Sequence, residues 1–581
     1  MKFSMKLVLS FSEIFPNETP KQLSEYLQGI ERKKLMKIGS FFLGFNHKGS
    51  QYADPIAFMQ MFFSPKNSEI FQQAANNIQT YLIKQGHAIE NAEIPYVVSS
   101  LNFFELAYNI SEQEIVEEKS DEEIEIAVFK AYLLLNEQLT KVRDSTIHQI
   151  DKLLPVHKKP TGVLLFLQLH NFDLTNYDLD KLFTTQFLRA LMFFDFLHQR
   201  EDCKTLLEEF YKYYGVEDYK EYLKRILPLT TSIIKKDKEA HTDIILDETA
   251  DEKDIEFLNK LAIDNIDVLN DFDFKNIRAT PIYRVSERTF RIISPLFAME
   301  LVYNGLYWKL KEINDKLLKQ QKPKDLYGLK TFEFSEKFVL NTVLKEIFGD
   351  RFFQKTGEEL DRQFDGAPDY YVRKDNKIIL FESKDIMLNA QVKESMDFLE
   401  IQQALNEKLY KKEDGTGKAV MQIIGNVRKV LTSNLGFDAD YSAEDIIITP
   451  VLVLHYRMFN TSGLNKFINF WFQEELQLLK NEGLKISNVQ PLVIVDIDTL
   501  IFNKDIFADR ILELDDCLTD YQTDYVGYNG QGRTFTSQKY QEQALFNSFL
   551  PFSAYLDDKI DKMGIRKIPR DIEDKGFKIF D

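Results

Sequence analysis

The stretch GAPDYYVRKDNKIILFESKD, residues 366–385, predicts a β-hairpin around which the fold of the C-terminal half is organised. Two runs rich in β-branched and aromatic residues flank Asp375-Asn376, where a two-residue turn would place Asp369 opposite Glu382. This register pairs Arg373 with Ile378, Val372 with Ile379, Tyr371 with Leu380 and Tyr370 with Phe381. Paired residues share one face of the sheet, with Cβ atoms about 5 Å apart. We therefore expect two carboxylates to face each other at the open end of the hairpin.

Lys384 projects from the same face as Glu382, because side chains alternate along a strand. Facing carboxylates repel each other, and a divalent cation relieves that repulsion. A nearby ammonium can orient or deprotonate a water, or stabilise charge on a phosphate. A one-residue slip in register would separate the carboxylates, so an ordinary exposed strand edge is the alternative. The opposite face is apolar and is expected to be the core side; it carries Tyr370, Val372, Ile379 and Phe381.

Helical and strand periodicities continue on both sides of the hairpin. A helix is expected at about 332–348, a short strand within 350–355, a helical insert at about 388–411 and a helix at about 417–433. A strand at 445–457, a helix at about 463–482 and a strand at 490–502 follow. The last strand contains VIVDIDTLIF, which superficially resembles the haloacid-dehalogenase phosphatase motif. It lacks the Gly between Asp498 and Thr499, so we interpret it as a buried strand.

The hairpin resembles the signature of the PD-(D/E)xK nuclease superfamily, in Pro368-Asp369 and Glu382-Ser383-Lys384. The resemblance covers about residues 326–457 and implies an α/β core in which a mixed central sheet is flanked by helices in the order αβββαβ. It also implies a divalent cation, Mg²⁺ or Mn²⁺, bound by Asp369, Glu382 and the carbonyl of Ser383. Lys384 would position or activate a water.

Two further site residues come from this resemblance. Glu336 on the first helix would complete the metal site, with Glu333 as the alternative; either could instead be a helix N-terminal charge. Gln422, which follows Gly417-Lys418 on the helix after the Glu-x-Lys strand, would assist catalysis. A solvated helix face would show the same polar spacing as Gln422 and its neighbours.

The composition of the chain limits which other functions and cellular locations are compatible with it. The net charge of −18 over 581 residues argues against coating nucleic acid through a general positive field, although a local basic groove is compatible with it. The only cysteines, Cys203 and Cys517, cannot form a disulfide framework and fit a reducing, cytoplasmic location. No apolar run has the length of a membrane span, and the N-terminal residues lack a signal-peptide cleavage site.

We expect four regions along the chain. Residues 1–240 are mostly helical, and 241–325 form a connecting region with short strands and a long helix. Residues 326–505 form the nuclease-like domain, and 506–581 a C-terminal extension. No family is recognised for the N-terminal half.

The resulting hypothesis is a metal-dependent nuclease that acts on DNA, with RNA a possible substrate. The helical N-terminal region would bind a protein partner or a trigger, and a role in antiviral defence or as a bacterial toxin is suggested by analogy alone. Two alternatives remain: a non-catalytic scaffold that retains the nuclease fold, and a phosphatase or other hydrolase that uses the same metal site.

Overall fold

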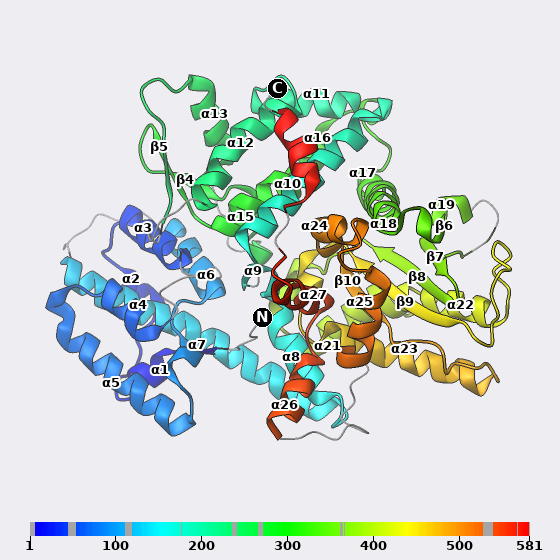
Figure 1. The fold of residues 1–581 in the computed structure, drawn as a ribbon. Helices are drawn as coiled ribbons and strands as arrows, with labels where there is room; N and C mark the ends of the chain where they lie inside the picture. Colours follow the sequence, from blue (N-terminus) through cyan, green and yellow to red (C-terminus); the bar gives the residue numbers. More distant parts are fainter. Residues whose placement is uncertain are drawn as a thin grey trace.

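A computed structural model describes residues 6–44, 54–110, 119–175, 177–234, 241–264, 271–360, 364, 366–526, 538–565 and 568–579. Helices dominate the N-terminal half, and a five-stranded sheet lies in the C-terminal half (Figure 1). Within these residues, no helix combines the length and the apolar composition that a membrane crossing requires.

The N-terminal region is helical, as expected. Its helices are α1 (Phe11–Ile14), α2 (Leu23–Leu27), α3 (Arg32–Leu43), α4 (Pro55–Phe62), α5 (Ser68–Gln85), α6 (Val97–Asn109), α7 (Asp121–Leu153), α8 (Lys159–Leu169), α9 (Phe172–Thr175), α10 (Leu179–His198), α11 (Lys204–Tyr214) and α12 (Tyr219–Ile234). A short parallel pair joins β1 (Leu7–Val8), at the start of this region, to β2 (Ala92–Glu93), which precedes α6. The longest helix, α7, begins with a capping box in which Ser120 and Glu123 each bond the other's backbone N–H.

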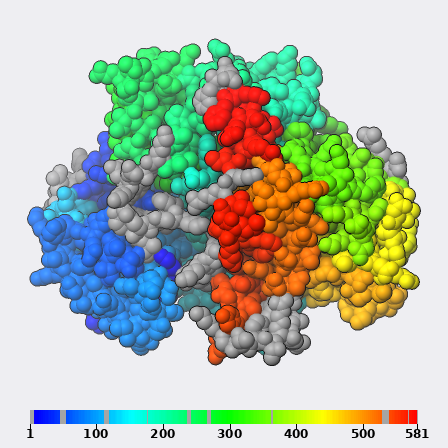
Figure 2. Space-filling view, in the orientation of Figure 1, coloured from blue at the N-terminus to red at the C-terminus, as the bar shows by residue number. Residues whose placement is uncertain are grey.

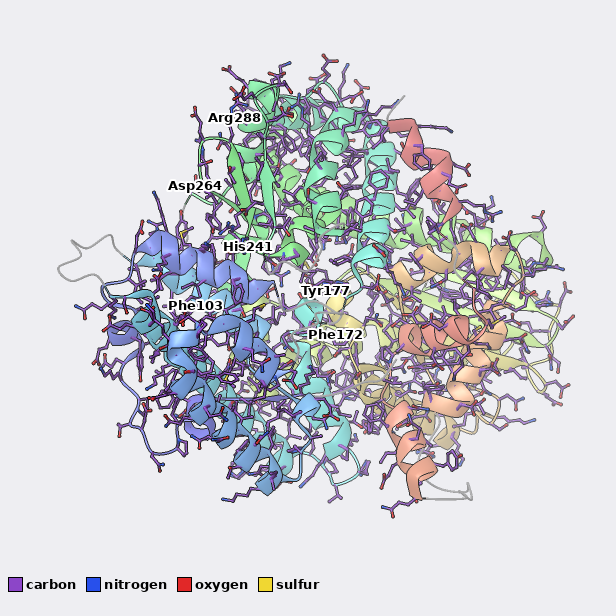
Figure 3. All side chains as sticks on the ribbon, turned by 60° about the vertical axis from the view of Figure 1, so that its left-hand side comes forward. Phe103, Phe172, Tyr177, His241, Asp264 and Arg288 are labelled. Atoms are coloured by element: carbon purple, nitrogen blue, oxygen red, sulfur yellow. The ribbon has the colours of Figure 1, made fainter. Side chains whose placement is uncertain are left out.

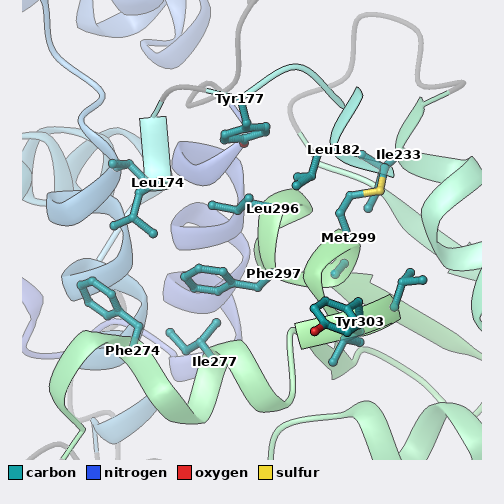
Figure 4. Packing of buried hydrophobic residues seen from close by; sticks show 14 of the residues in the cluster. Leu174, Tyr177, Leu182, Ile233, Phe274, Ile277, Leu296, Phe297, Met299 and Tyr303 are labelled. Carbon is teal, nitrogen blue, oxygen red and sulfur yellow. The ribbon is translucent and has the colours of Figure 1, made fainter. Parts of the chain in front are cut away.

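The connecting region contains a small antiparallel sheet and a long helical segment. The sheet has the order β3 (Asp243–Ile245), β5 (Thr289–Ile292), β4 (Ile282–Arg284). The helices are α13 (Glu252–Leu261), α14 (Lys275–Ala279), α15 (Pro295–Glu300), a π-helical stretch η5 (Leu301–Gly305) and α16 (Leu306–Lys316). Figure 4 shows Phe297 of α15 among Leu174, Phe274 and Ile277, so α15 lies in the interior of the molecule.

The five-stranded sheet has the order β10-β9-β8-β7-β6. Its strands are β6 (Phe353–Thr356), β7 (Tyr370–Lys374), β8 (Lys377–Lys384), β9 (Ile447–Leu454) and β10 (Val493–Asp496). The pairs β6/β7 and β7/β8 are antiparallel, whereas β8/β9 and β9/β10 are parallel. The carboxyl ends of β8, β9 and β10 therefore meet at one edge of the sheet.

Helices cover both faces of this sheet (Figure 1). One face packs against η7 (Leu329–Val339), α18 (Leu340–Phe348) and α24 (Ile497–Ala508). The other packs against α22 (Ala419–Leu431) and α23 (Leu464–Asn481). The insert between β8 and α22 is helical, as expected, and comprises α20 (Ala390–Ser395), α21 (Phe398–Leu405) and η9 (Asn406–Tyr410). Short helices α17 (Leu326–Gly328) and α19 (Gly357–Leu360) complete this part of the chain.

The prediction of one strand over 490–502 is wrong beyond Asp496. The strand stops there and α24 begins, because Oδ2 of Asp496 accepts hydrogen bonds of 3.1 Å from both the backbone N–H and the hydroxyl of Thr499. This is an N-cap, which satisfies a backbone donor that the first turn of a helix leaves unpaired. A continuous apolar run does not distinguish a buried strand from a buried helix.

The C-terminal residues cross one face of the molecule, between the N-terminal region and the sheet (Figure 2). Their helices are α25 (Leu514–Tyr521), α26 (Gln538–Asn547), α27 (Phe552–Lys562) and the short turns η12 (Ile572–Gly576) and η13 (Phe577–Ile579). One apolar cluster contains side chains from the N-terminal helices, the connecting region, the sheet and this segment. The division at 240, 325 and 505 stays a prediction.

Ion pairs join the regions near the centre of the molecule, where Figure 3 places Phe172 of α9 and the nearby Tyr177. Lys393 of the insert is 2% exposed and contacts Asp173 of α9 at 3.0 Å and Asp273 of the connecting region at 2.7 Å. Arg278 contacts the same two aspartates, at 2.9 and 3.1 Å, and also Glu300 at 3.0 Å. Buried charges need such partners, so this network holds the insert against the N-terminal half.

Candidate active site

The hairpin adopts the predicted register. Arg373 pairs with Ile378, Val372 with Ile379, Tyr371 with Leu380 and Tyr370 with Phe381. Asp375 in the turn has φ 51°, a left-handed conformation that Asp tolerates better than most residues. Strand β8 lies in the middle of the sheet, and Glu382 is 1% exposed, so this is not an exposed edge. The predicted core face is buried, and Ile378 and Leu380 on the other face are buried too.

Asp369, Glu382 and Lys384 come together at the carboxyl end of β8. Oδ2 of Asp369 accepts a hydrogen bond of 2.7 Å from the backbone N–H of Ser383. Nζ of Lys384 lies 2.7 Å from Oε1 of Glu382 and 3.8 Å from Oδ2 of Asp369. The ammonium therefore lies between the two carboxylates.

Glu336 joins this group from η7. Its Oε1 accepts from the backbone N–H of Asp385 at 3.3 Å. Glu333, the alternative, pairs with Lys337 on the same helix at 3.2 Å. The helix is π-helical over Leu329–Val339, and Phe332, which shares a stripe with Glu336 in an α-helix, is exposed. A π-helical stretch rotates side chains away from their α-helical positions and is frequent at functional sites.

The buried carboxylates at this site are destabilised in their charged form. Burial, together with the charge of Asp369, raises the pKa of Glu382. Burial raises the pKa of Glu336 to about 7. Burial alone would lower the pKa of Lys384, but Glu382, Asp369 and Glu336 outweigh it and raise that pKa. The raised pKa values favour the protonated forms of Glu382 and Glu336, and added positive charge would favour their charged forms.

A second group of polar residues packs around the main chain that carries Glu382 and Lys384. Oγ of Ser383 lies 2.7 Å from Nε2 of His455, directly after β9, and burial lowers the pKa of His455 to about 3. Asp385 contacts Nζ of Lys330 at 2.6 Å and accepts a hydrogen bond of 2.5 Å from Ser335 Oγ. These contacts hold the main chain on both sides of Lys384.

Gln422 is not brought into this group. It is exposed on α22, and within the described part of the chain its side chain makes no hydrogen bond to Asp369, Glu382 or Lys384. Asn426, four residues further along α22, is buried. Lys429 bonds the carbonyl of Gly366 at 2.8 Å, so α22 contacts the segment that leads into β7.

Gly357 is a site residue that the sequence analysis missed. Its backbone N–H donates a hydrogen bond of 2.8 Å to the carbonyl of Asp369. A Cβ at this position would lie 3.0 Å from that carbonyl oxygen and 3.1 Å from Cα of Asp369. Nothing in the local sequence signals the approach, because the two residues come from different elements.

The oxygen donors present are of the kind that Mg²⁺ and Mn²⁺ prefer. Oε1 of Glu382 is buried, and the ammonium of Lys384 lies 2.7 Å from it. Across the described residues, however, no three His, Cys, Asp or Glu side chains are already arranged as a metal-binding group. A cation here would have to displace the ammonium of Lys384 from its contact with Glu382.

Comparisons with protein-family models, with curated proteins and with solved structures find no match to this chain.

Proposed function

We propose that this protein is a metal-dependent nuclease that hydrolyses phosphodiester bonds. The observation that carries the proposal is the convergence of Asp369, Glu382 and Glu336 around Lys384, at the carboxyl end of a central strand. The site lies in a mixed five-stranded sheet with helices on both faces, which supports the proposal.

Asp369 and Glu382 would hold Mg²⁺ or Mn²⁺, with the carbonyl of Ser383 and Glu336 as further oxygen donors. The cation would polarise the scissile phosphate and lower the pKa of a bound water. With its pKa raised by the three carboxylates, Lys384 stays protonated. Its role would then be to stabilise negative charge on the phosphate, since a general base works best with a pKa near the operating pH.

The substrate class would be nucleic acid, with DNA favoured over RNA. The net charge of −18 makes weak non-specific binding away from the site the expected behaviour. The helical N-terminal region would receive a protein partner or trigger, and the ion-pair network at Lys393 supports coupling between that region and the insert beside the site. A cytoplasmic role in antiviral defence is part of the same proposal.

The test is cleavage of plasmid DNA and of a long RNA with Mg²⁺ or Mn²⁺ by wild type, Asp369→Asn, Lys384→Ala and Glu336→Gln. Each variant should lose about a hundredfold or more in rate. Glu333→Gln is the matched control on the same helix and should cut like wild type, because Glu333 pairs with Lys337 instead. Gln422→Ala reports whether an exposed glutamine contributes to cutting.

If the folded wild type cuts neither DNA nor RNA, Mn²⁺ binding to wild type and to Asp369→Asn is measured next. Equal binding by wild type and Asp369→Asn would contradict the nuclease and favour the non-catalytic scaffold. Binding that is lost in Asp369→Asn would keep the metal site and point to a missing trigger.

A further inference from the structure

Two exposed aromatic rings lie on the helical segment that carries Glu336. Tyr327 of α17 is 59% exposed, and Phe332 of η7 is 46% exposed. A single exposed apolar side chain needs no explanation, but grouped ones often mark a binding surface. The two rings are five residues apart on one continuous helical segment, which is close to one turn where the helix is π-helical. They are called the aromatic pair below.

The aromatic pair is attached to the candidate site. Lys330, between the two rings in the chain, pairs with Asp385 at 2.6 Å. Glu336, four residues after Phe332, accepts the backbone N–H of Asp385 at 3.3 Å. Burial and the charges of Asp385 and Glu336 raise the pKa of Tyr327, so its phenol lies within electrostatic range of the same residues. Four helical residues span about 6 Å, or about two nucleotide steps of roughly 3.4 Å.

Lysines gather along the same part of an otherwise acidic chain. Residues 308–337 contain eight lysines and five acidic residues, a net charge of +3, against −18 for the whole chain. Nζ of Lys337 lies 4.2 Å from the ring centre of Phe332, so a cation borders the aromatic pair. Between α16 and α17 are three lysines that pair with no acidic side chain in the described part of the chain: Lys319, Lys322 and Lys324. Local positive charge of this kind attracts a phosphate backbone to an acidic protein.

We propose that the aromatic pair binds unpaired bases of a single-stranded DNA or RNA that enters the candidate site. This inference rests on the nuclease function proposed above, whose substrate it narrows to single strands. Stacking on an aromatic side chain needs an exposed base face, which a single strand offers and an intact duplex keeps within its own stack. The lysines between α16 and α17 would contact phosphates on the approach to the site.

The test measures binding to the full-length protein by fluorescence anisotropy. The probes are labelled oligo-dT and oligo-U of about 20 nucleotides and a mixed-sequence DNA duplex of the same length. One series contains Ca²⁺ in place of Mg²⁺ and a second contains EDTA, and a gel checks that each probe stays intact. Single strands should bind about tenfold or more tightly than the duplex. The oligo-dT and oligo-U arms show which of the two sugars the surface favours.

Substitutions in the aromatic pair test its role directly. Tyr327→Ala and Phe332→Ala should each weaken single-strand binding about fivefold or more, because each removes one stacking ring. Tyr327→Phe keeps the ring and should bind like wild type. The matched controls are Tyr540→Ala and Phe577→Ala, whose rings are 62% and 61% exposed in the C-terminal segment. Neither control should change the affinity.

The lysines are tested through the salt dependence of binding. Each phosphate contact on a single strand contributes about 0.7 to the slope of log K against log salt concentration. The double variant Lys319→Gln, Lys324→Gln should therefore lower that slope by about 1.4. Lys412→Gln, an exposed lysine elsewhere on the surface, is the control.

The outcomes separate this proposal from the nuclease itself. Single-strand binding that depends on Tyr327 and Phe332 supports the proposal even if the wild type cuts neither DNA nor RNA. Wild-type affinity in both alanine variants would overturn it, as would a duplex bound as tightly as the single strands or no binding of either single strand. Rings that serve a protein partner instead would give one of these contrary results. Metal-dependent cleavage would in that case leave the nuclease in place without the single-strand surface.

Discussion

The backbone N–H of Gly357 donates a hydrogen bond of 2.8 Å to the carbonyl oxygen of Asp369. This contact fixes the main chain at Asp369, immediately before strand β7 begins, where its carboxylate turns toward Ser383 and Lys384. The approach is close enough that only a residue without a Cβ fits without displacement.

Gly357→Ala should therefore disturb the candidate site directly. The added Cβ would lie 3.0 Å from a backbone oxygen that cannot rotate away, so we expect a loss of about 1–3 kcal/mol in unfolding free energy. Cleavage or Mn²⁺ binding should fall by more than this loss explains, because Asp369 moves. Chemical denaturation and metal titration measure the two effects.

Gly425→Ala is the matched control for that substitution. It lies inside α22, and an added Cβ meets nothing within 4 Å. Alanine there should stabilise the helix by about 0.5–1 kcal/mol and leave metal binding unchanged. If both alanine variants bind Mn²⁺ like wild type, Gly357 has no role in placing Asp369.

Lys384→Met should destabilise the protein in the absence of divalent metal. Removing the ammonium leaves the buried Glu382 beside Asp369 without its nearest positive charge, a change that costs about 3 kcal/mol or more for a buried pair. Mg²⁺ should stabilise this variant more than it stabilises wild type. Thermal unfolding with EDTA and with Mg²⁺ measures the difference.

The double variant Lys384→Met, Glu382→Gln tests whether the unpaired charge of Glu382 causes the loss of stability. Without the carboxylate there is no unpaired charge, so the double variant should be more stable than Lys384→Met alone. Equal stabilities would mean that the ion pair contributes little to folding.

Lys393→Met should loosen the insert from the N-terminal half. Lys393 is 2% exposed between Asp173 and Asp273, and its loss leaves both aspartates with Arg278 as their shared partner. We expect a loss of about 3–5 kcal/mol and faster proteolysis within residues 388–411. Lys412→Met, an exposed lysine just after the insert, should change neither measurement.

Glu105→Gln should flatten the pH dependence of stability. Burial and the neighbouring Asp271 raise the pKa of Glu105 from 4.5 to about 9. Between pH 4.5 and about 9, the folded protein therefore holds a proton on Glu105 that the unfolded chain releases. The contribution of Glu105 to the free energy of unfolding falls by about 1.4 kcal/mol per pH unit as the pH rises between these two values.

Urea unfolding of wild type and of Glu105→Gln is measured from pH 4.5 to about 9. The difference between their free energies of unfolding at each pH is the contribution of Glu105. The variant should gain stability relative to wild type as the pH rises. Glu69→Gln, on the exposed side of α5, should show no such gain. A difference that does not change with pH would show that Glu105 titrates normally.

Much of the sheet's centre follows from local sequence. The alternation of β7 and β8 and the two residues between them specify one register, so the meeting of Asp369, Glu382 and Lys384 is contained in twenty consecutive residues. The helices at 464–481 and 419–431 likewise follow from their apolar periodicity.

Other features depended on contacts between distant segments. Apolar continuity in VIVDIDTLIF did not reveal that the strand stops at Asp496, because the N-cap bond to Thr499 decides that position. The π-helical form of η7 sets the direction of Glu336, and an α-helical pattern does not anticipate it. Gln422 has a plausible spacing in sequence, yet its helix presents it to solvent.

The sequence by itself determined the hairpin, its register and the three charged residues at its open end, since pairing between adjacent strands needs only a short turn and a period of two. Tertiary structure alone decided that Gly357 lies behind Asp369, that His455 lies against Ser383 and that the Lys393 network forms. It also brings Glu336, which the resemblance had named, to the site. These contacts link residues far apart in the chain, where packing and charge compensation, rather than local propensity, select the partner.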